Sequence, residues 1–328
     1  MKTRLAAFFS MPAQDEAPHL DLHAVVFAGP NGSGKTSLID EIKKTGLATV
    51  RGVYPLPAHF INPDQVAKDL EGDFPDQDAR DAAAQRAAIR VRAEAIGQKQ
   101  NFAFETVMSH PSRISEMLLL KEQGYRLFLT FITTDNPETN VARVKLRYTT
   151  QTTTGHFVAP EKVRERYHRT LALLPLAAEI ADAVYVYDNS TDFEQPVLQA
   201  VIERDGLFSV LPTAKQWVVD QLVRPLQERE MELGYLVAGV DKLGYPLSDT
   251  DELRGSYGGE VLMSTRYFLA LYDQASQTAT IHDRLMLEVG SQQLLSEQSS
   301  YESRQCLAIR YTPTTAPFIA RLPPQTDS

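Results

Sequence analysis

The sequence GPNGSGKT at residues 29–36 decides the fold, because it fits the pattern Gly-x-x-x-x-Gly-Lys-Ser/Thr at every defined position. Residues 23–28 (HAVVFA) precede it and are apolar, as a buried parallel strand requires. Residues 36–44 follow it with apolar side chains at helical spacing. A strand, a glycine-rich loop and a helix in this order predict a phosphate-binding loop, whereas a chance glycine turn would lack both flanks.

The chemistry of such a loop is that of a polyphosphate site. Its glycines let the backbone wrap phosphates with N–H groups, and the helix N-terminus adds a partial positive charge. We expect Lys35 to act catalytically by reaching the β- and γ-phosphates, and the Thr36 hydroxyl to ligate Mg²⁺. The residues expected to bind the nucleotide are Gly29, Asn31, Gly32, Ser33, Gly34, Lys35, Thr36 and Ser37. The loop therefore predicts binding of ATP or GTP, with ATP and Mg²⁺ as the expected cofactors.

Composition narrows the class of protein. The 328 residues carry a net charge of −9, which argues against a general nucleic-acid binder with a basic surface. One cysteine, Cys306, excludes an internal disulfide framework. The apolar patch at residues 5–9 is too short for a signal peptide, and no later run has the length of a membrane span. We therefore expect a cytoplasmic protein with no membrane or nucleic-acid partner.

Strand-like and helix-like segments alternate up to residue 205. Such alternation predicts an α/β fold in which helices flank a parallel sheet, with ligands at the carboxyl ends of the strands. The fold expected is the P-loop NTPase type. The strands are expected at residues 23–28, 59–62, 101–107, 126–134 and 184–188, and the helices at 36–44, 78–98, 112–121, 137–148 and 160–181.

The pattern changes after residue 205, where several strands follow one another without helices between them. This change predicts a smaller α+β domain at 206–328, after a nucleotide-binding domain at 1–205. Because these strands begin only after the last parallel strand, we expect the first domain to fold without the second. The segments expected are a helix at 214–233, strands at 260–273 and 278–289, and a hairpin of 305–311 with 317–322.

Polar residues directly follow two of the predicted parallel strands, so they should meet beside the nucleotide. Asp64 has no cation beside it in the sequence and is suited to accept a proton from a substrate hydroxyl. Its residue type alone favours the alternative, a cap on the helix at residues 65–70. Glu105 lies at a strand end, where a carboxylate orders the magnesium shell or binds substrate hydroxyls. A surface glutamate that merely ends a strand is the alternative reading of Glu105.

Arginines are frequent on the two helices that surround residues 148–160. Arg143 shares a helix face with Arg147. Arg164, Arg166 and Arg169 follow on the next helix, where Arg166 and Arg169 share a face. Arginines delivered by a covering segment stabilise the negative charge of a phosphoryl group in transfer, although each one alone is typical of a solvated helix. Thr154-Gly155-His156 lies between these helices and has the polar, flexible composition of a lid. We interpret His156 and His110 as loop-structuring residues in preference to catalytic bases.

Five segments in a fixed order resemble the zeta toxin family of P-loop kinases, and most closely its bacterial zeta-toxin-like branch. The resemblance covers residues 23–190. The segments are GPNGSGKTSL (29–38), INPDQVA (61–67), FAFETVMS (102–109), GHFVAPEKVRERYHRTL (155–171) and VYVYDNS (184–190).

The resemblance implies an activity and a partner. Well-studied zeta toxins are ATP-dependent kinases of the 3′-hydroxyl of UDP-N-acetylglucosamine, and they usually pair with an antitoxin that blocks the ATP site. By motif, Lys35 and Thr36 match the ATP and magnesium residues, and Asp64 matches the aspartate that deprotonates the sugar hydroxyl. The resemblance places Asn62, Glu105 and Thr106 at the substrate site, and it makes Arg143 and Arg166 phosphate-binding arginines.

Three departures from the branch leave the acceptor open. Thr154 replaces the first glycine of Gly-Gly-His, Val107-Met108 replaces Thr-Leu, and Leu173-Leu174 replaces Asn-Leu. The leading hypothesis is a Mg-ATP-dependent kinase of a nucleotide-sugar hydroxyl, acting as the toxin of a toxin–antitoxin pair. One alternative is a phosphotransferase for another small-molecule hydroxyl, on an antibiotic or a nucleoside. The other is a nucleotide-gated switch whose C-terminal module binds a protein or a nucleic acid.

Overall fold

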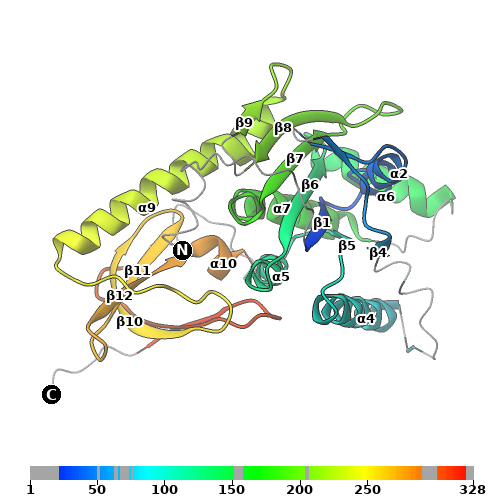
Figure 1. Ribbon diagram of the computed structural model, residues 1–328. Coiled ribbons are helices and arrows are strands. Elements are labelled where there is room, and N and C mark those ends of the chain that lie inside the picture. Colours follow the sequence, from blue (N-terminus) through cyan, green and yellow to red (C-terminus); the bar gives the residue numbers. More distant parts are fainter. Residues whose placement is uncertain are drawn as a thin grey trace.

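A computed structural model describes residues 22–49, 52–62, 66, 74–75, 77–150, 158–203, 207–289 and 301–322 of the chain. These residues form a seven-stranded sheet, a five-stranded sheet and a short hairpin, with helices packed around and between the two sheets (Figure 1). Within this described part, no helix is both long enough and apolar enough to cross a membrane.

The predicted parallel sheet is confirmed, with the strand of the phosphate-binding loop at its centre. That strand, β1 (His23–Ala28), is buried along its whole length and runs parallel to β5 (Phe102–Thr106) and β6 (Arg126–Thr133). The spatial order is β4-β5-β1-β6-β7-β8-β9, where β4 (His59–Ile61) and β7 (Ala183–Asp188) are also parallel members. The loop after β1 therefore lies at the carboxyl edge between two other strand ends.

The sheet is wider than the sequence indicated. After β7, which was expected to be its last strand, β8 (Val197–Glu203) and β9 (Leu207–Val210) add an antiparallel edge. The first sheet thus extends beyond the boundary expected at residues 205/206, and we place the division of the chain after residue 210. A hairpin of two three-residue strands, β2 (Leu47–Thr49) and β3 (Gly52–Tyr54), was also missed, because strands so short show no periodicity.

The two faces of the sheet bury different partners, as the alternation of a strand requires. On one face, the even-numbered residues of β1 join the larger core with helices α4 (Gln77–Gly97), α5 (Pro111–Glu122) and α7 (Pro160–Ile180). On the other face, Val25 and Phe27 pack with α2 (Lys35–Thr45).

The ends of the five helices predicted before residue 205 agree with the structure to within two residues. The fifth of these helices is α6 (Pro137–Thr150). The helix predicted at 214–233 starts at Gln216 but continues, through one π-helical turn, to Lys242.

The C-terminal part is an antiparallel sheet behind a long helix, as its α+β pattern predicted (Figure 1). The helical region starts with α8 (Gln216–Val218), passes through one π-helical turn and continues as α9 (Arg224–Lys242). The sheet order is β12-β11-β10-β13-β14. Its elements are β10 (Ser256–Ser264), β11 (Phe268–Asp273), β12 (Thr278–Asp283), the short helix α10 (Arg284–Glu288), β13 (Cys306–Arg310) and β14 (Phe318–Arg321).

Two of the strands predicted for this part were wrong in extent. The run 260–273 is two antiparallel strands, because the chain reverses at Thr265, whose hydroxyl accepts from the Phe268 N–H at 3.2 Å. The run 278–289 ends as a strand at Asp283, whose carboxylate accepts from the Leu285 N–H at 2.9 Å and starts α10. The predicted hairpin of 305–311 with 317–322 is confirmed as β13 with β14.

The two parts of the chain share one core. A continuous cluster of buried apolar side chains runs from the first sheet through α7 and α9 to the second sheet. At its centre Arg229 of α9 is fully buried and donates to Glu179 of α7 at 2.6 and 2.8 Å. The same guanidinium donates to Asp283 at the end of β12 at 2.6 Å. This packing argues against the independent folding of the first domain that the sequence led us to expect.

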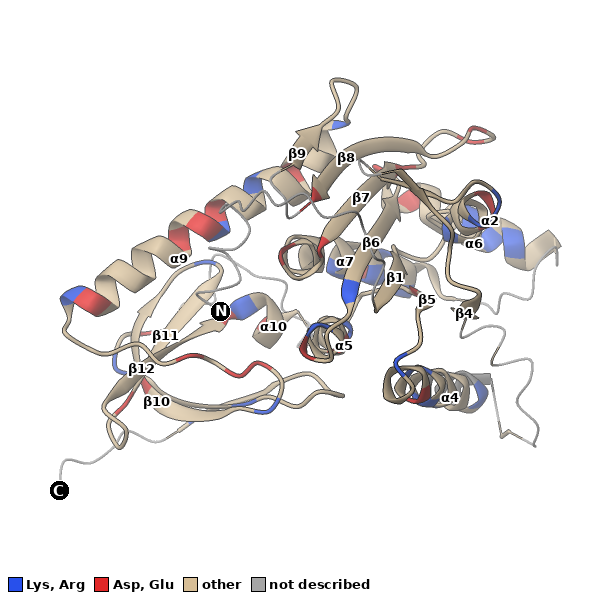
Figure 2. Ribbon diagram, in the orientation of Figure 1, with Lys and Arg blue, Asp and Glu red and all other residues tan. Residues whose placement is uncertain are grey.

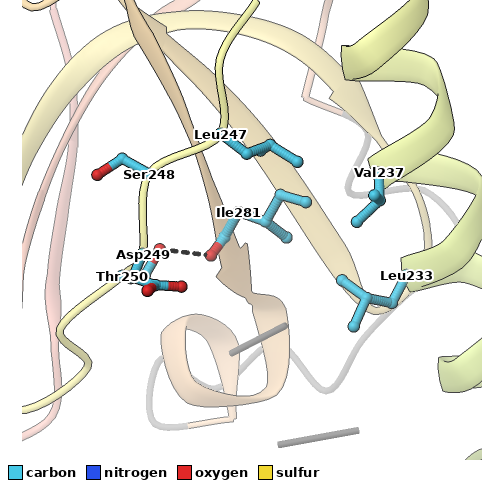
Figure 3. Close-up of a pocket in the computed structure, with 7 residues that line it drawn as sticks. All are labelled: Leu233, Val237, Leu247, Ser248, Asp249, Thr250 and Ile281. Carbon is cyan, nitrogen blue, oxygen red and sulfur yellow. Dashed lines mark hydrogen bonds between the residues drawn. The ribbon is translucent and has the colours of Figure 1, made fainter. Parts of the chain in front are cut away.

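A small cavity lies where α9 meets the second sheet (Figure 3). Its volume is about 70 Å³, which is room for about two water molecules. A nucleotide or a sugar does not fit there, so the cavity is not a candidate for the substrate site. It is lined by Leu233, Val237, Leu247, Ser248, Asp249, Thr250 and Ile281.

One buried histidine makes stability depend on pH. Burial lowers the pKa of His282 to about 3, and its ring is hydrogen-bonded to Thr280 and Tyr311. Between about pH 3 and pH 6.5 the unfolded chain binds a proton that the native protein does not, so stability falls as pH falls through 6.5. We expect this residue to account for a loss of about 2 kcal/mol between pH 7.5 and pH 5.

Urea unfolding at both pH values measures this loss. His282→Gln should remove that part of the pH dependence, whereas the matched control Tyr311→Phe, which keeps the buried imidazole, should retain it. Equal pH dependence in His282→Gln and the wild-type protein would contradict the assignment.

Candidate active site at the carboxyl edge of the sheet

The phosphate-binding loop needs glycine at two positions for steric reasons. Gly32 and Gly34 have φ of 80° and 95°, in the left-handed region that side chains disfavour. A Cβ on Gly32 would lie 2.5 Å from the Asn140 carbonyl oxygen, and one on Gly34 would lie 2.1 Å from the Asn189 side-chain nitrogen. The loop backbone is therefore pressed directly against residues that follow the two neighbouring strands β6 and β7.

Two asparagine side chains hold the loop from those neighbours. Asn140, buried in the first turn of α6, donates to the Asn31 carbonyl at 2.7 Å. Asn189, directly after β7, donates to the Ser33 carbonyl at 2.9 Å. The carbonyls of Asn31 and Ser33 are therefore occupied by side chains from outside the loop. This leaves N–H groups of the loop to bind a phosphate.

Neither Asn140 nor Asn189 was assigned a role from the sequence. Asn189 follows a predicted strand directly, and the same layout had singled out Asn62 and Glu105, so its position was a usable signal. Asn140 lies within a predicted helix, and no residue pattern there marks it as a contact of the loop. The carbonyl that it binds, that of Asn31, is 109 residues earlier in the sequence.

The loop lysine is held inside the site. Lys35 is the first residue of α2 and is 7% exposed. Its Nζ donates to the carbonyls of Gly29 at 2.8 Å and Pro30 at 3.0 Å, and lies 3.7 Å from Glu105 Oε1. A phosphate entering the loop would compete for this ammonium. The Ser33 hydroxyl is buried and has no hydrogen-bond partner within the described residues, so it is a further group available to a ligand.

The predicted substrate residues meet beside Lys35. Asn62 donates to Glu105 Oε2 at 3.4 Å, so the carboxylate lies between an amide and the loop ammonium. The Thr106 carbonyl accepts from the Gly29 N–H at 3.3 Å, and its hydroxyl accepts from the Met108 N–H at 3.1 Å. Asp64, the predicted base, lies outside the described residues.

The Lys and Arg positions of α6 and α7 are blue in Figure 2. Of the five arginines on these helices, Arg166 contacts the loop itself, and Arg143 contacts Asn189, which holds the loop. Arg166 of α7 donates to Asn31 Oδ1 at 3.2 Å. Arg143 of α6 donates to the Asn189 carbonyl at 2.7 Å and to Asp192 at 2.6 and 3.0 Å. These are the two arginines that the resemblance had selected; Arg166 touches the loop directly, and Arg143 is connected to it through Asn189.

The other three arginines do not point to the loop. Arg164 pairs with Glu138 at 2.6 Å, and Arg169 pairs with Glu165 at 2.6 Å, while Arg147 is exposed. These pairs agree with ordinary solvated helix charge.

Two further expectations concern loops. His110 caps α5 by accepting from the Ser112 N–H at 3.2 Å, as expected for a loop-structuring residue. Thr154, Gly155 and His156 of the predicted lid lie outside the described residues.

The residues present fit a magnesium ion that arrives with a nucleotide. Thr36 is exposed in the first turn of α2, next to Lys35. Within the described residues no group of three His, Cys, Asp or Glu side chains is placed to hold a metal. Mg²⁺ usually keeps several waters and binds through one or two protein oxygens plus substrate phosphates, which suits Thr36 with Glu105 nearby.

Sequence comparison connects the chain to known proteins. The family model described as zeta toxin matches residues 11–194, more than half of the chain. An uncharacterized protein of Haemophilus influenzae is 32% identical over 144 residues, which are 44% of this chain and 91% of the relative.

Solved structures show partial likeness. A complex of AvrRxo1-ORF1 with -ORF2 and ATP has a TM-score of 0.43 at 17% identity, over 58% of this chain and 61% of that one. The PezAT chromosomal toxin–antitoxin system of Streptococcus pneumoniae has a TM-score of 0.40 at 14% identity, over 68% of this chain and 90% of that one.

Proposed function

The chain belongs to the zeta toxin family, and on that premise we propose that it is a Mg-ATP-dependent kinase of a small-molecule hydroxyl. The acceptor we propose is a nucleotide sugar resembling UDP-N-acetylglucosamine, and the biological role that of a toxin with an antitoxin partner. The observation that supports this best is the meeting of Lys35, Glu105 and Arg166 around one glycine-rich loop. Cations for the phosphates and a carboxylate for the acceptor lie side by side there.

Each residue has a distinct part in this proposal. Lys35 binds the β- and γ-phosphates, and Arg166 with Arg143 stabilises the negative charge that spreads over the transferring group. Glu105 and Asn62 bind and orient the acceptor hydroxyls. Thr36 and the nucleotide phosphates would hold Mg²⁺, which would neutralise part of the phosphate charge when bound. Catalysis in such a site is mostly positioning and electrostatics.

The residues on the acceptor side favour a kinase over a nucleotide-gated switch. Asn62 donates to Glu105, and Asp64 follows Asn62 by two residues in the sequence. A nucleotide-gated switch that only hydrolyses ATP slowly has no need of a base on this side of the phosphates. A phosphotransferase for an antibiotic or a nucleoside would use the same residues, so only the acceptor itself separates it from the nucleotide-sugar kinase.

The test of function is to identify the acceptor. The full chain is incubated with Mg-ATP and a bacterial metabolite extract, and new phosphorylated species are read by mass spectrometry. A phosphorylated UDP-sugar supports the proposal, and a phosphorylated antibiotic or nucleoside supports the second enzyme. Release of ADP and inorganic phosphate without any phosphorylated metabolite would instead support the nucleotide-gated switch.

Asp64→Asn should separate catalysis from nucleotide binding. If Asp64 accepts the hydroxyl proton, we expect turnover on the identified acceptor to fall by about 100-fold while the Kd for ATP stays within about twofold. Asp40→Asn, on the exposed side of α2, is the matched control and should behave as the wild-type protein. Near-normal turnover in Asp64→Asn would mean that this aspartate only caps a helix.

A further inference from the structure

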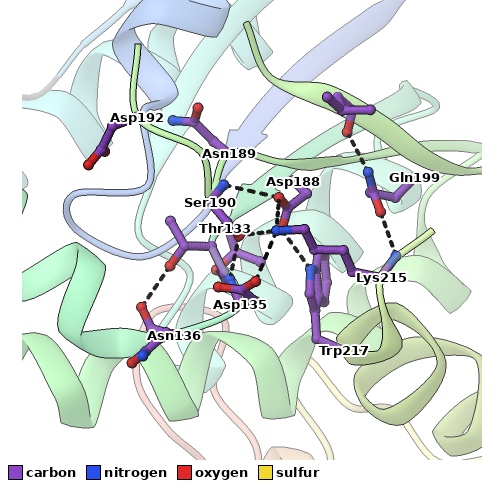
Figure 4. Close-up of polar contacts among 12 residues, drawn as sticks. Thr133, Asp135, Asn136, Asp188, Asn189, Ser190, Asp192, Gln199, Lys215 and Trp217 are labelled. Atoms are coloured by element: carbon purple, nitrogen blue, oxygen red, sulfur yellow. Dashed lines mark hydrogen bonds and ion pairs between the residues drawn. The ribbon is translucent and has the colours of Figure 1, made fainter. Parts of the chain in front are cut away.

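The C-terminal part reaches the carboxyl edge of the first sheet through one short segment. Lys215 and Trp217, at the start of α8, converge on the ends of β6 and β7 (Figure 4). The segment is anchored at its own backbone, since the Lys215 N–H donates to Gln199 Oε1 of β8 at 2.8 Å. These contacts join the part after residue 210 to the edge where the nucleotide is proposed to bind.

Asp188, the last residue of β7, is the centre of these contacts. Its carboxylate is 4% exposed and accepts from Trp217 Nε1 at 2.8 Å and from the Lys215 ammonium at 3.0 Å. It also accepts from the Ser190 N–H at 3.0 Å and from the Ser190 hydroxyl at 2.7 Å. A buried carboxylate with this many donors has a fixed position, and it fixes the residue that follows it.

The residue that follows is one of the two asparagines that hold the phosphate-binding loop. Asn189 is locked by its N–H, which donates to the Thr133 carbonyl at 2.8 Å, while its side chain donates to the Ser33 carbonyl at 2.9 Å. Trp217 is therefore connected to the loop in three steps: a hydrogen bond to Asp188, the peptide bond from Asp188 to Asn189, and the hydrogen bond from Asn189 to the Ser33 carbonyl.

Lys215 also binds the segment that leads to Asn140, the second asparagine that holds the loop. Its ammonium lies 2.9 Å from Asp135, which directly follows Thr134. The Thr134 hydroxyl is hydrogen-bonded to Asn140, whose amide donates to the Asn31 carbonyl at 2.7 Å. One lysine thus links the ends of β6 and β7, which lead to the two asparagines that hold the loop.

We propose that Lys215 and Trp217 are positioning residues of the nucleotide site, which hold the ends of β6 and β7 so that Asn189 and Asn140 shape the loop for phosphate. The C-terminal part then sets the affinity for ATP. By linkage, nucleotide binding stabilises the docking of residues 215–217. A partner that shifts this segment changes the affinity for ATP by the same factor by which ATP changes the affinity for that partner. This inference rests on the proposed ATP binding.

The wild-type protein contains its own reporter. Trp217 is the single tryptophan of the chain, and its indole N–H is bonded to the residue before Asn189. Titration with Mg-ATP should change the Trp217 emission in a saturable way, with the Kd found independently by calorimetry. ATP binding by calorimetry with an unchanged emission would overturn the positioning role and leave the kinase proposal intact. Absence of ATP binding in both measurements would overturn both.

Lys215→Met tests the same role by substitution, because it removes the charge and keeps the length of the side chain. Two carboxylates, Asp135 and Asp188, would then lie beside a polyphosphate site without their shared cation. We expect the Kd and KM for ATP to rise by about tenfold, with kcat changed less than twofold. Lys215→Arg should restore most of the affinity.

A purely structural role would give a different pattern. The control Lys242→Met, at the exposed far end of α9, should leave ATP affinity unchanged. If Lys215→Met lowers the melting temperature but binds ATP as the wild-type protein does, the positioning role is wrong. If the variant does not fold, the emission titration of the wild-type protein decides the question.

Discussion

Replacing Lys35 with alanine should reduce phosphoryl transfer by about 1,000-fold or more while the fold is retained. The ammonium is the buried cation of the phosphate-binding loop, and it lies against the carbonyls of Gly29 and Pro30 and 3.7 Å from Glu105. Removing a group that stabilises the transferring phosphate typically lowers the rate by two to five orders of magnitude. Its contacts are polar, so the apolar core is left intact.

Product formation on the identified acceptor measures the rate, and thermal melts with and without Mg-ATP measure binding. The wild-type protein should be stabilised by ATP, and Lys35→Ala should not. Lys44→Ala, an exposed change at the end of the same helix, should keep both properties. Equal stabilisation of Lys35→Ala and the wild-type protein by ATP would place the nucleotide elsewhere.

Arg229→Ala should lower the free energy of unfolding by about 3–5 kcal/mol, because it leaves two carboxylates buried without their cation. Burial lowers the pKa of Arg229, but Asp283 and Glu179 raise it by more, so the guanidinium stays charged in the core. It also lies 4.9 Å from the centre of the Phe268 ring. Arg224→Ala, which removes an exposed ion pair on the same helix, should have a small effect.

Urea unfolding measures both the loss of unfolding free energy in Arg229→Ala and the number of unfolding transitions. If the two parts share one core, the wild-type protein unfolds in a single transition, and Arg229→Ala shifts that transition as a whole. A triple variant with Arg229→Met, Glu179→Gln and Asp283→Asn should recover most of the loss, since no buried charge remains. Two separate transitions, with only one shifted by Arg229→Ala, would mean that the parts fold independently.

The parallel sheet could be predicted because its signals are local. Residues 23–28 and 126–134 are continuous apolar runs with glycine or polar residues at their ends, and the helices between strands show their own periodicity. The phosphate-binding loop was the clearest case, since its chemistry fixes residue types at fixed spacing. The convergence of Asn62 and Glu105 beside Lys35 followed from their positions at the ends of predicted parallel strands.

The rest depends on contacts between distant residues. Trp217 has the residue type of a core position, and it is buried, but its indole also binds Asp188 across 29 residues. Arg229 reads as ordinary helix charge in the sequence, because Glu179 and Asp283 lie 50 and 54 residues away. Tertiary packing gave these residues roles that local pattern and residue type do not encode.

The central position of Arg229 has a consequence for the order of events on the ribosome. Glu179 leaves the ribosome about 100 residues before Asp283, and at the usual rate of translation that interval lasts about 5–20 s. During this time the nascent chain has its phosphate-binding loop but lacks the strand that completes the core beneath α7. A chain interrupted in that interval would present an apolar face to chaperones and proteases, so the shared core would be complete only once nearly all of the chain has been made.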